Sequence, residues 1–174
     1  AFDAAKIKGG KINVKKVAEG TKFVTLDGVE RKLSAHDLMI CNAEEPMCMA
    51  GVFGGHDSGV TEQTTSIFIE SAYFNPVTIR KTARRHGLNT DASFRYERGI
   101  DPNNTIYVLK YVALLIQELA GGEISSEIID LYPTPMADFK VNVTLDKIHT
   151  LIGKAIPEET IETIFKGLEM RIIS

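Results

Sequence analysis

The sequence changes from a strand-like to a helix-like pattern at Asn75-Pro76, and this change constrains the fold more than any other feature. Asn is a good N-cap and Pro a good first helical residue, while Gly87 provides a stop, so a helix is expected over residues 76–86. Asp101-Pro102 repeats the start signal. Apolar residues at helical spacing then continue to Gly121-Gly122, which predicts a second, longer helix.

Short strands are expected on either side of these two main helices. Asp27-Gly28 lies between the strand-like segments 23–26 and 29–33, which predicts a hairpin closed by a type I′ turn. Further strands are expected at residues 11–17, 38–41, 47–53, 66–74 and 124–132. Runs of strands followed by helices favour an α+β domain with mixed or antiparallel sheets.

A stiff, proline-rich segment, Tyr132-Pro133-Thr134-Pro135, predicts a domain boundary. Residues 1–135 are therefore assigned to one domain, and residues 136–174 to the truncated beginning of an α/β module. In that module we expect strands at 139–143 and 170–173, with helices at 145–152 and 157–166. About 40 residues are too few for an independent core. The chain opens on Ala1 rather than Met, so we expect it to be a piece of a longer protein.

The composition is that of an ordinary globular protein, with 44% apolar and 25% charged residues in a chain of 174. No apolar run reaches the ~18 residues that span a bilayer, so no membrane segment is expected. The two cysteines, Cys41 and Cys48, lie in apolar surroundings and suit a reduced intracellular protein. No pair of residues has the spacing of a zinc site, so no metal is expected.

One basic segment stands out in a chain whose net charge is −3. Residues 80–98 contain six basic and two acidic side chains, a charge of +4, so the rest of the chain carries −7. The basic residues of the predicted helix repeat at a spacing of four and form a paired stripe: Arg80, Lys81, Arg84 and Arg85. Such a stripe fits the phosphate backbone of a nucleic acid, and it is also the pattern of a solvated helix face.

Three further features are candidates for a binding site. Glu70 is a single carboxylate in an apolar pattern, and its burial is costly unless it is hydrogen-bonded, so it either faces a pocket or points to solvent. The glycines of residues 51–55 allow the backbone to approach a ligand closely, or they form a plain turn. Residues 90–102 are dense in hydrogen-bonding groups and are either a functional connection or a capped, salt-bridged one.

Six motifs in a fixed order resemble the beta subunit of bacterial phenylalanine–tRNA ligase. They are Ala1-Phe2-Asp3, Gly51-Val-Phe-Gly-Gly55, Glu70-Ser-Ala-Tyr-Phe74, Arg80-Lys-Thr-Ala-Arg-Arg-His-Gly-Leu88, Thr90-Asp-Ala92 and Arg95-Tyr-Glu-Arg-Gly-Ile-Asp-Pro102. The resemblance covers residues 1 to about 135, which it identifies as the tRNA-editing domain, the third and fourth modules of that subunit. Residues 136–174 resemble the start of the next module. The family motif also has a His of the editing pocket directly before Ala1.

The resemblance implies a cytoplasmic α2β2 enzyme that uses ATP and magnesium to attach phenylalanine to its tRNA. The synthetic site of the family lies in the alpha subunit, so this chain is expected to hold no cofactor of its own. What it is expected to do is to hydrolyse tyrosine that has been wrongly attached to phenylalanine tRNA.

The pocket residues of the family match Gly54, Glu70, Thr90 and Ala92, and Glu70 is expected to bind the hydroxyl of tyrosine. No residue is assigned as a covalent catalyst; a positioned water is expected instead, helped by backbone donors and the terminal ribose of the tRNA. The basic stripe fits contact with tRNA. The alternative function is a structural module of the synthetase that docks tRNA without local chemistry.

Overall fold

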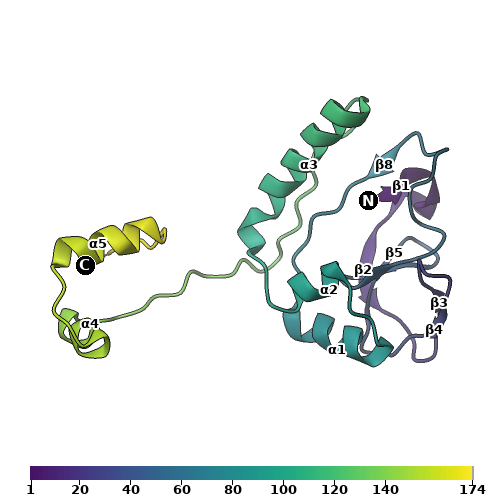
Figure 1. Ribbon diagram of the computed structural model, residues 1–174. Helices are drawn as coiled ribbons and strands as arrows, with labels where there is room; N and C mark the ends of the chain where they lie inside the picture. Colours follow the sequence, from purple (N-terminus) through teal and green to yellow (C-terminus); the bar gives the residue numbers. More distant parts are fainter. Residues whose placement is uncertain (174) are drawn as a thin grey trace. The chain divides into compact units, whose positions relative to one another are not determined.

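The computed structural model describes residues 1–173, which form two compact units. The first spans Ala1–Leu131, and the second begins at Tyr132 (Figure 1). Strands and helices are both present in the first unit and every strand pair described is antiparallel, so the predicted α+β class is confirmed.

A four-stranded antiparallel sheet forms the centre of the first unit, in the order β2-β5-β6-β7. Its strands are β2 (Asn13–Lys16), β5 (Leu38–Cys41), β6 (Pro46–Met49) and β7 (Phe53–Gly54). Elsewhere β1 (Phe2–Asp3) pairs with β8 (Ile67–Phe68), which joins segments more than 60 residues apart. The prediction of one strand over residues 47–53 is wrong in its middle, because the chain reverses between Met49 at the end of β6 and Phe53 at the start of β7.

The predicted hairpin is present as β3 (Lys22–Val24) and β4 (Glu30–Lys32), but its turn is not type I′. Such a turn needs positive φ at two successive residues, and here only Gly28 has it, at 77°. The Gly28 amide donates to the Thr25 carbonyl, and the Thr25 amide donates to the carbonyl of Val29. This is a three-residue loop with glycine in the left-handed position, the next commonest hairpin connection.

Helix α1 (Pro76–His86) has the predicted bounds because its ends are specified locally. The Asn75 side chain accepts hydrogen bonds from the amides of Val77 and Thr78, at 3.0 and 3.1 Å. Gly87 ends the helix with φ 63°, a left-handed conformation that costs glycine little. Ile79 and Ala83 on one face of α1 are buried in the core of the unit.

Two further helices complete the first unit. Helix α2 (Asp91–Tyr96) was not predicted, since it falls in the stretch that we expected to be a connection. Helix α3 (Thr105–Ala120) follows a short 3-10 turn, Pro102–Asn104, and ends at Gly121 as predicted. None of the residues of α3 is buried within the part of the chain that the structure describes.

The second unit contains α4 (Leu145–Ile152) and α5 (Glu158–Gly167), close to the predicted helices. Thr144 caps α4 and Gly153 ends it, as the sequence indicates. The strands predicted at 124–132, 139–143 and 170–173 are absent, and the strand predicted at 66–74 is reduced to Ile67–Phe68. The alternating pattern is there, but these segments have no hydrogen-bonded partner strand among the described residues.

The core of the first unit lies between the central sheet and α1. It consists of aliphatic, aromatic and sulfur-containing side chains that are at most 7% exposed: Phe2, Phe23, Leu33, Met39, Ile40, Cys41, Met47, Met49, Ala50, Val52, Phe74, Ile79 and Ala83. Cys41 is thus a small core residue, which agrees with its apolar surroundings in the sequence. The core holds β5 and β6 against α1, and the candidate site lies beside it.

Candidate functional site

A pocket of about 360 Å³ lies where the central sheet, the segment around Glu70 and α2 meet. Its volume is within the range of sites that bind small molecules. Twelve residues line it: Ile40, Cys48, Gly51, Val52, Phe53, Gly54, Glu70, Phe74, Thr90, Asp91, Ala92 and Tyr96. The four residues predicted for the editing pocket, Gly54, Glu70, Thr90 and Ala92, are all among them. Their roles in binding stay predictions.

Glu70 is the half-buried carboxylate of this pocket. It makes no ion pair with any residue in the described range. Burial raises the pKa of Glu70 above its ordinary value because water is withdrawn from the charged form. Of the two alternatives for Glu70, the structure shows the one in which it faces a pocket. A carboxylate in this state gains free energy from any hydroxyl or amine that enters and donates to it.

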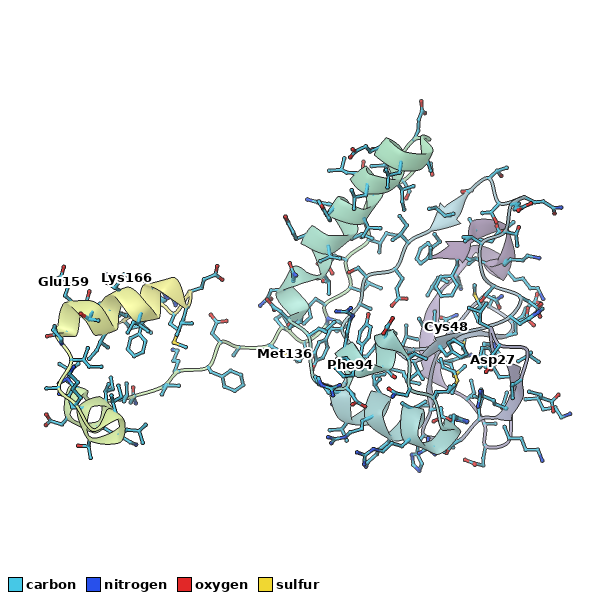
Figure 2. All side chains as sticks on the ribbon, in the orientation of Figure 1. Asp27, Cys48, Phe94, Met136, Glu159 and Lys166 are labelled. Atoms are coloured by element: carbon cyan, nitrogen blue, oxygen red, sulfur yellow. The ribbon has the colours of Figure 1, made fainter. Side chains whose placement is uncertain are left out.

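Cys48 and Tyr96 line the same pocket as Glu70 and are near enough for its charge to raise their pKa values. Burial, and secondarily the Glu70 carboxylate, raise the pKa of Cys48 to about 12. Burial, then Glu70 and Cys48, raise the pKa of Tyr96 to about 12 as well. Cys48 lies on β6 (Figure 2), and its thiol contacts the carbonyls of Met49 and Phe53 at 3.4 Å. A thiol with such a pKa is protonated at neutral pH and is a poor nucleophile.

Tyr96 also forms an aromatic wall with Phe74. The two ring centroids are 5.4 Å apart and the rings are tilted by 39°, a favourable geometry for an aromatic pair. Gly51 lies against this wall with φ 64°, and a Cβ there would be 3.2 Å from both rings. Glycine at position 51 therefore lets the chain turn closely past the wall without pushing the rings into the pocket.

Thr90 connects two sides of the pocket. Its hydroxyl donates to the Val52 carbonyl at 2.6 Å and accepts from the Ser93 amide at 3.0 Å. The Ser93 hydroxyl accepts in return from the Thr90 amide, so the two residues form a capping box at the start of α2. The single hydroxyl proton of Thr90 is thus already used, and the oxygen can only accept from a ligand.

The two adjacent glycines of the loop differ in what they allow. A Cβ at Gly54 would meet no atom within 4 Å, so this position leaves open space at the pocket. A Cβ at Gly55 would lie 2.5 Å from the Met47 carbonyl and 2.9 Å from Phe23. Gly55 is therefore required by the packing of the backbone, whereas Gly54 contributes to the space for a ligand.

One residue of the predicted basic stripe, Arg85, differs from the other three because it contacts the buried carboxylate of Asp37. Asp37, which is fully buried, accepts hydrogen bonds from Thr82 at 2.9 Å and from the Ser34 amide at 2.8 Å. Arg85 forms an ion pair with it, and the Nε2 atom of His86 lies 2.7 Å from its Oδ2 atom. Arg85 therefore fastens α1 to the loop before β5. This network was not predicted, because Asp37 is distant from α1 in sequence.

Arg80, Lys81 and Arg84 are exposed on the opposite side of α1. None of these three side chains makes an ion pair with another residue of the described range. Just after α2, the guanidinium of Arg98 lies 3.5 Å from the ring centroid of Phe94, labelled in Figure 2, and donates a hydrogen bond to the Phe94 carbonyl. The exposed charge on α1 is consequently unneutralised, and it fits a polyanion.

Eight of the twelve pocket residues were not predicted as site residues, and three of these eight carry titratable side chains: Cys48, Asp91 and Tyr96. Cys48 belongs to a strand whose pairing brings it opposite Gly54, a fact that sequence spacing does not give. Asp91 and Tyr96 are the first and last residues of α2. Thr90 is a good N-cap residue, and this was the sequence signal from which α2, and with it both residues, could have been predicted.

No group of three or more His, Cys, Asp or Glu side chains among the described residues is arranged to hold a metal ion. No helix within residues 1–173 is both long enough and apolar enough to cross a membrane.

Comparison with known proteins agrees with this architecture. Residues 1–121 match the family described as the B3/4 domain, and the chain belongs to this family. Over 172 residues it is 66% identical to the phenylalanine–tRNA ligase beta subunit of Bacteroides fragilis strain YCH46. The corresponding beta subunits of Bacteroides thetaiotaomicron and Porphyromonas gingivalis are 65% and 54% identical over 173 residues.

These alignments cover 99% of the chain but 21% of each relative. The chain therefore spans about a fifth of the length of the curated relatives it matches. The resemblance to the beta subunit of an aminoacyl-tRNA ligase, first drawn from six motifs, is confirmed at this level of identity.

Proposed function

We propose that this chain carries the editing site of a phenylalanine–tRNA ligase beta subunit, where tyrosine esterified to phenylalanine tRNA is hydrolysed. The observation on which the proposal rests is the carboxylate of Glu70, which lines the pocket without an ion pair to any residue within 1–173. The phenol hydroxyl of tyrosine would donate a hydrogen bond to the Glu70 carboxylate, whereas the ring of phenylalanine has no donor for it. A site built to bind a hydroxyl strongly rejects the analogue that lacks that group.

The shape of the pocket supports an aromatic substrate. Phe74 and Tyr96 provide an aromatic wall on one side, and Gly54 and Ala92 are too small to fill the space. A non-catalytic module would be favoured by a filled pocket with Glu70 in a salt bridge. The pocket is open and Glu70 has no such partner among the described residues, which supports a binding site instead.

The proposed reaction is the addition of water to the ester carbonyl. The oxygen of water bonds to the carbonyl carbon, and the bond between that carbon and the ribose oxygen breaks. One proton of the water passes to the ribose oxygen, which leaves as the free hydroxyl of the tRNA, and tyrosine is released. Cys48 is unsuited to covalent catalysis because its thiol is protonated, so the chain's part is to hold the substrate and position water.

The wider setting is also a proposal. By similarity to the beta subunits, the complete protein would act with an alpha subunit in an α2β2 cytoplasmic enzyme. The formation of phenylalanyl-tRNA, with its need for ATP and magnesium, would occur outside this chain. No step proposed for the pocket involves either group.

Hydrolysis of purified tyrosyl-tRNA and phenylalanyl-tRNA, both made on phenylalanine tRNA, tests this function. We expect the chain to deacylate the tyrosyl ester at least about tenfold faster, a difference of one hydrogen bond to a charged group. Glu70→Ala should remove the preference, while Glu62→Ala, a carboxylate on an exposed loop, should keep it. Equal rates for the two esters with the unaltered chain would refute the proposal.

The tRNA partner is proposed to contact the exposed face of α1 through Arg80, Lys81 and Arg84. Binding of uncharged phenylalanine tRNA should weaken as salt rises, because each phosphate contact releases counterions. Replacing the three residues by Ala should reduce the slope of log K against log salt by about 2–3. As a matched control, Ala at Lys11, Lys15 and Lys16, which are also exposed, should leave the slope unchanged. Equal slopes for the two triple variants would contradict the contact.

A further inference from the structure

The pocket has a polar side chain at its opening that no role yet accounts for. Asp91, the first residue of α2, lines the same pocket as Glu70. Asp91 and its neighbour Ala92 are exposed, whereas Glu70 and Tyr96 are half-buried. The pocket therefore has two carboxylates of unequal exposure: Glu70, which is more buried, and Asp91, on the exposed side that we call the mouth. Asp91 makes no ion pair with any residue of the described range.

The covalent structure of an aminoacyl ester sets which of its groups can reach each carboxylate. The ester joins the amino acid to an RNA that is too large to enter a pocket of about 360 Å³. The carbonyl, the Cα atom and the α-ammonium group must therefore stay near the mouth, and the ring must point inward. A phenol hydroxyl then reaches Glu70, and the ammonium group lies where Asp91 and Thr90 are.

The groups at the mouth are acceptors. A carboxylate such as that of Asp91 has no proton to donate and can only accept, and the Thr90 hydroxyl already donates its proton to the Val52 carbonyl at 2.6 Å. One lone pair of the Thr90 oxygen remains after its bond from the Ser93 amide. An ammonium group has three protons to donate and no acceptor, so it complements this pair of groups.

We infer that Asp91, assisted by Thr90, is a binding site for the α-ammonium group of the esterified amino acid. The inference rests on the proposed function, since it places the substrate with its ring at Glu70. It assigns the pocket two separate tasks. Glu70 distinguishes tyrosine from phenylalanine by the ring hydroxyl, while Asp91 distinguishes amino acids from des-amino compounds and fixes the ester at the mouth.

Two small probes separate these tasks. Tyramine and 4-ethylphenol have the same ring, hydroxyl and two-carbon side chain, and differ by the ammonium group. Binding of each to the 174-residue chain is measured by NMR titration, with the unaltered sequence and with Asp91→Asn. Asn preserves the shape of the side chain and leaves the capping box of Thr90 and Ser93 in place. Asp57→Asn is the matched control, because Asp57 is exposed and lines a different cavity.

The unaltered chain should bind tyramine about five- to tenfold more tightly than 4-ethylphenol, the range of an ion pair that is partly exposed. Asp91→Asn should abolish that ratio while leaving the affinity for 4-ethylphenol within about twofold. Asp57→Asn should change neither. Glu70→Ala should weaken both probes alike, since both have the hydroxyl.

The results that overturn the inference differ from those that overturn the proposed function. If both phenols bind and the ratio is the same in Asp91→Asn, Asp91 does not bind the ammonium group, and the proposed function stands. If neither phenol binds to the unaltered chain, the pocket does not accept tyrosine, and both proposals fail together.

Discussion

At the scale of single residues, the candidate site is built from groups that cost the fold stability. Glu70 is half-buried without an ion pair among the described residues, and Gly54 leaves open space at the pocket. Functional sites commonly combine such features, because a group that is already satisfied has nothing to offer a ligand. The cost should be measurable at Glu70.

Replacement of Glu70 by Gln should therefore stabilise the chain at neutral pH. Because burial raises its pKa, the folded state holds the Glu70 proton more tightly than the unfolded state does. The contribution of Glu70 to stability is thus lost as pH rises from its ordinary pKa through the raised one. At pH 7 we expect Glu70→Gln to raise the free energy of unfolding by about 1 kcal/mol, with no gain at pH 4.

Urea unfolding at the two pH values provides the measurement. Glu62→Gln is the control, since a surface change of this kind alters stability by less than about 0.5 kcal/mol. A variant Glu70→Gln that is less stable at pH 7 would show that the carboxylate is satisfied by the folded chain.

At the scale of elements, α1 is held to the sheet by the buried Asp37. The contacts of Thr82, Arg85 and His86 with Asp37 all come from the last two turns of the helix. Burial acts against ionisation of Asp37, but its hydrogen bonds from His86, the Ser34 amide and Thr82 outweigh it, and the pKa is lowered. The position of α1 determines where the chain leaves toward Thr90 and α2.

We expect Asp37→Ala to lower the free energy of unfolding by about 3–5 kcal/mol at pH 7, because it leaves buried donors without an acceptor. The sign of the pH effect is opposite to that of Glu70. Since the folded pKa is lowered, the stabilisation is present at neutral pH and is lost as pH falls below about 4.

Chemical unfolding between pH 7 and pH 3 tests both statements. As pH falls, the free energy of unfolding of the Asp37→Ala variant should decrease less than that of the unaltered chain, because the variant has no Asp37 carboxylate to protonate. Asp57→Ala, whose side chain is 92% exposed, should be close to the unaltered chain. A similar small cost for both variants would mean that the Asp37 network does not hold α1.

The elements that sequence reasoning predicted well are those specified by their own residues. The caps Asn75 and Gly87 give α1 its bounds, and Thr144 and Gly153 do the same for α4. A strand needs a partner that lies elsewhere in the chain, so an alternating pattern is insufficient. Residues 139–143 have the pattern and no partner among the described residues, whereas the two-residue β1 is formed because β8 pairs with it.

At the scale of the whole chain, the candidate site belongs to the first unit. Every residue that lines the pocket lies between Ile40 and Tyr96, within the part that matches the B3/4 domain family. Resemblance indicated Gly54, Glu70, Thr90 and Ala92, and the fold brings these four together. It did not indicate Asp91 or Tyr96, because their place in the pocket depends on how α2, which was not predicted, packs in the fold.

The central proposal is that this pocket distinguishes tyrosine from phenylalanine through Glu70. NMR titration of the chain with each amino acid, repeated on Glu70→Ala, tests it most directly. Tyrosine should shift resonances around Gly54, Glu70 and Thr90, phenylalanine should not, and the variant should lose the difference. Identical shifts with tyrosine and phenylalanine, or a difference that survives in Glu70→Ala, would contradict the proposal.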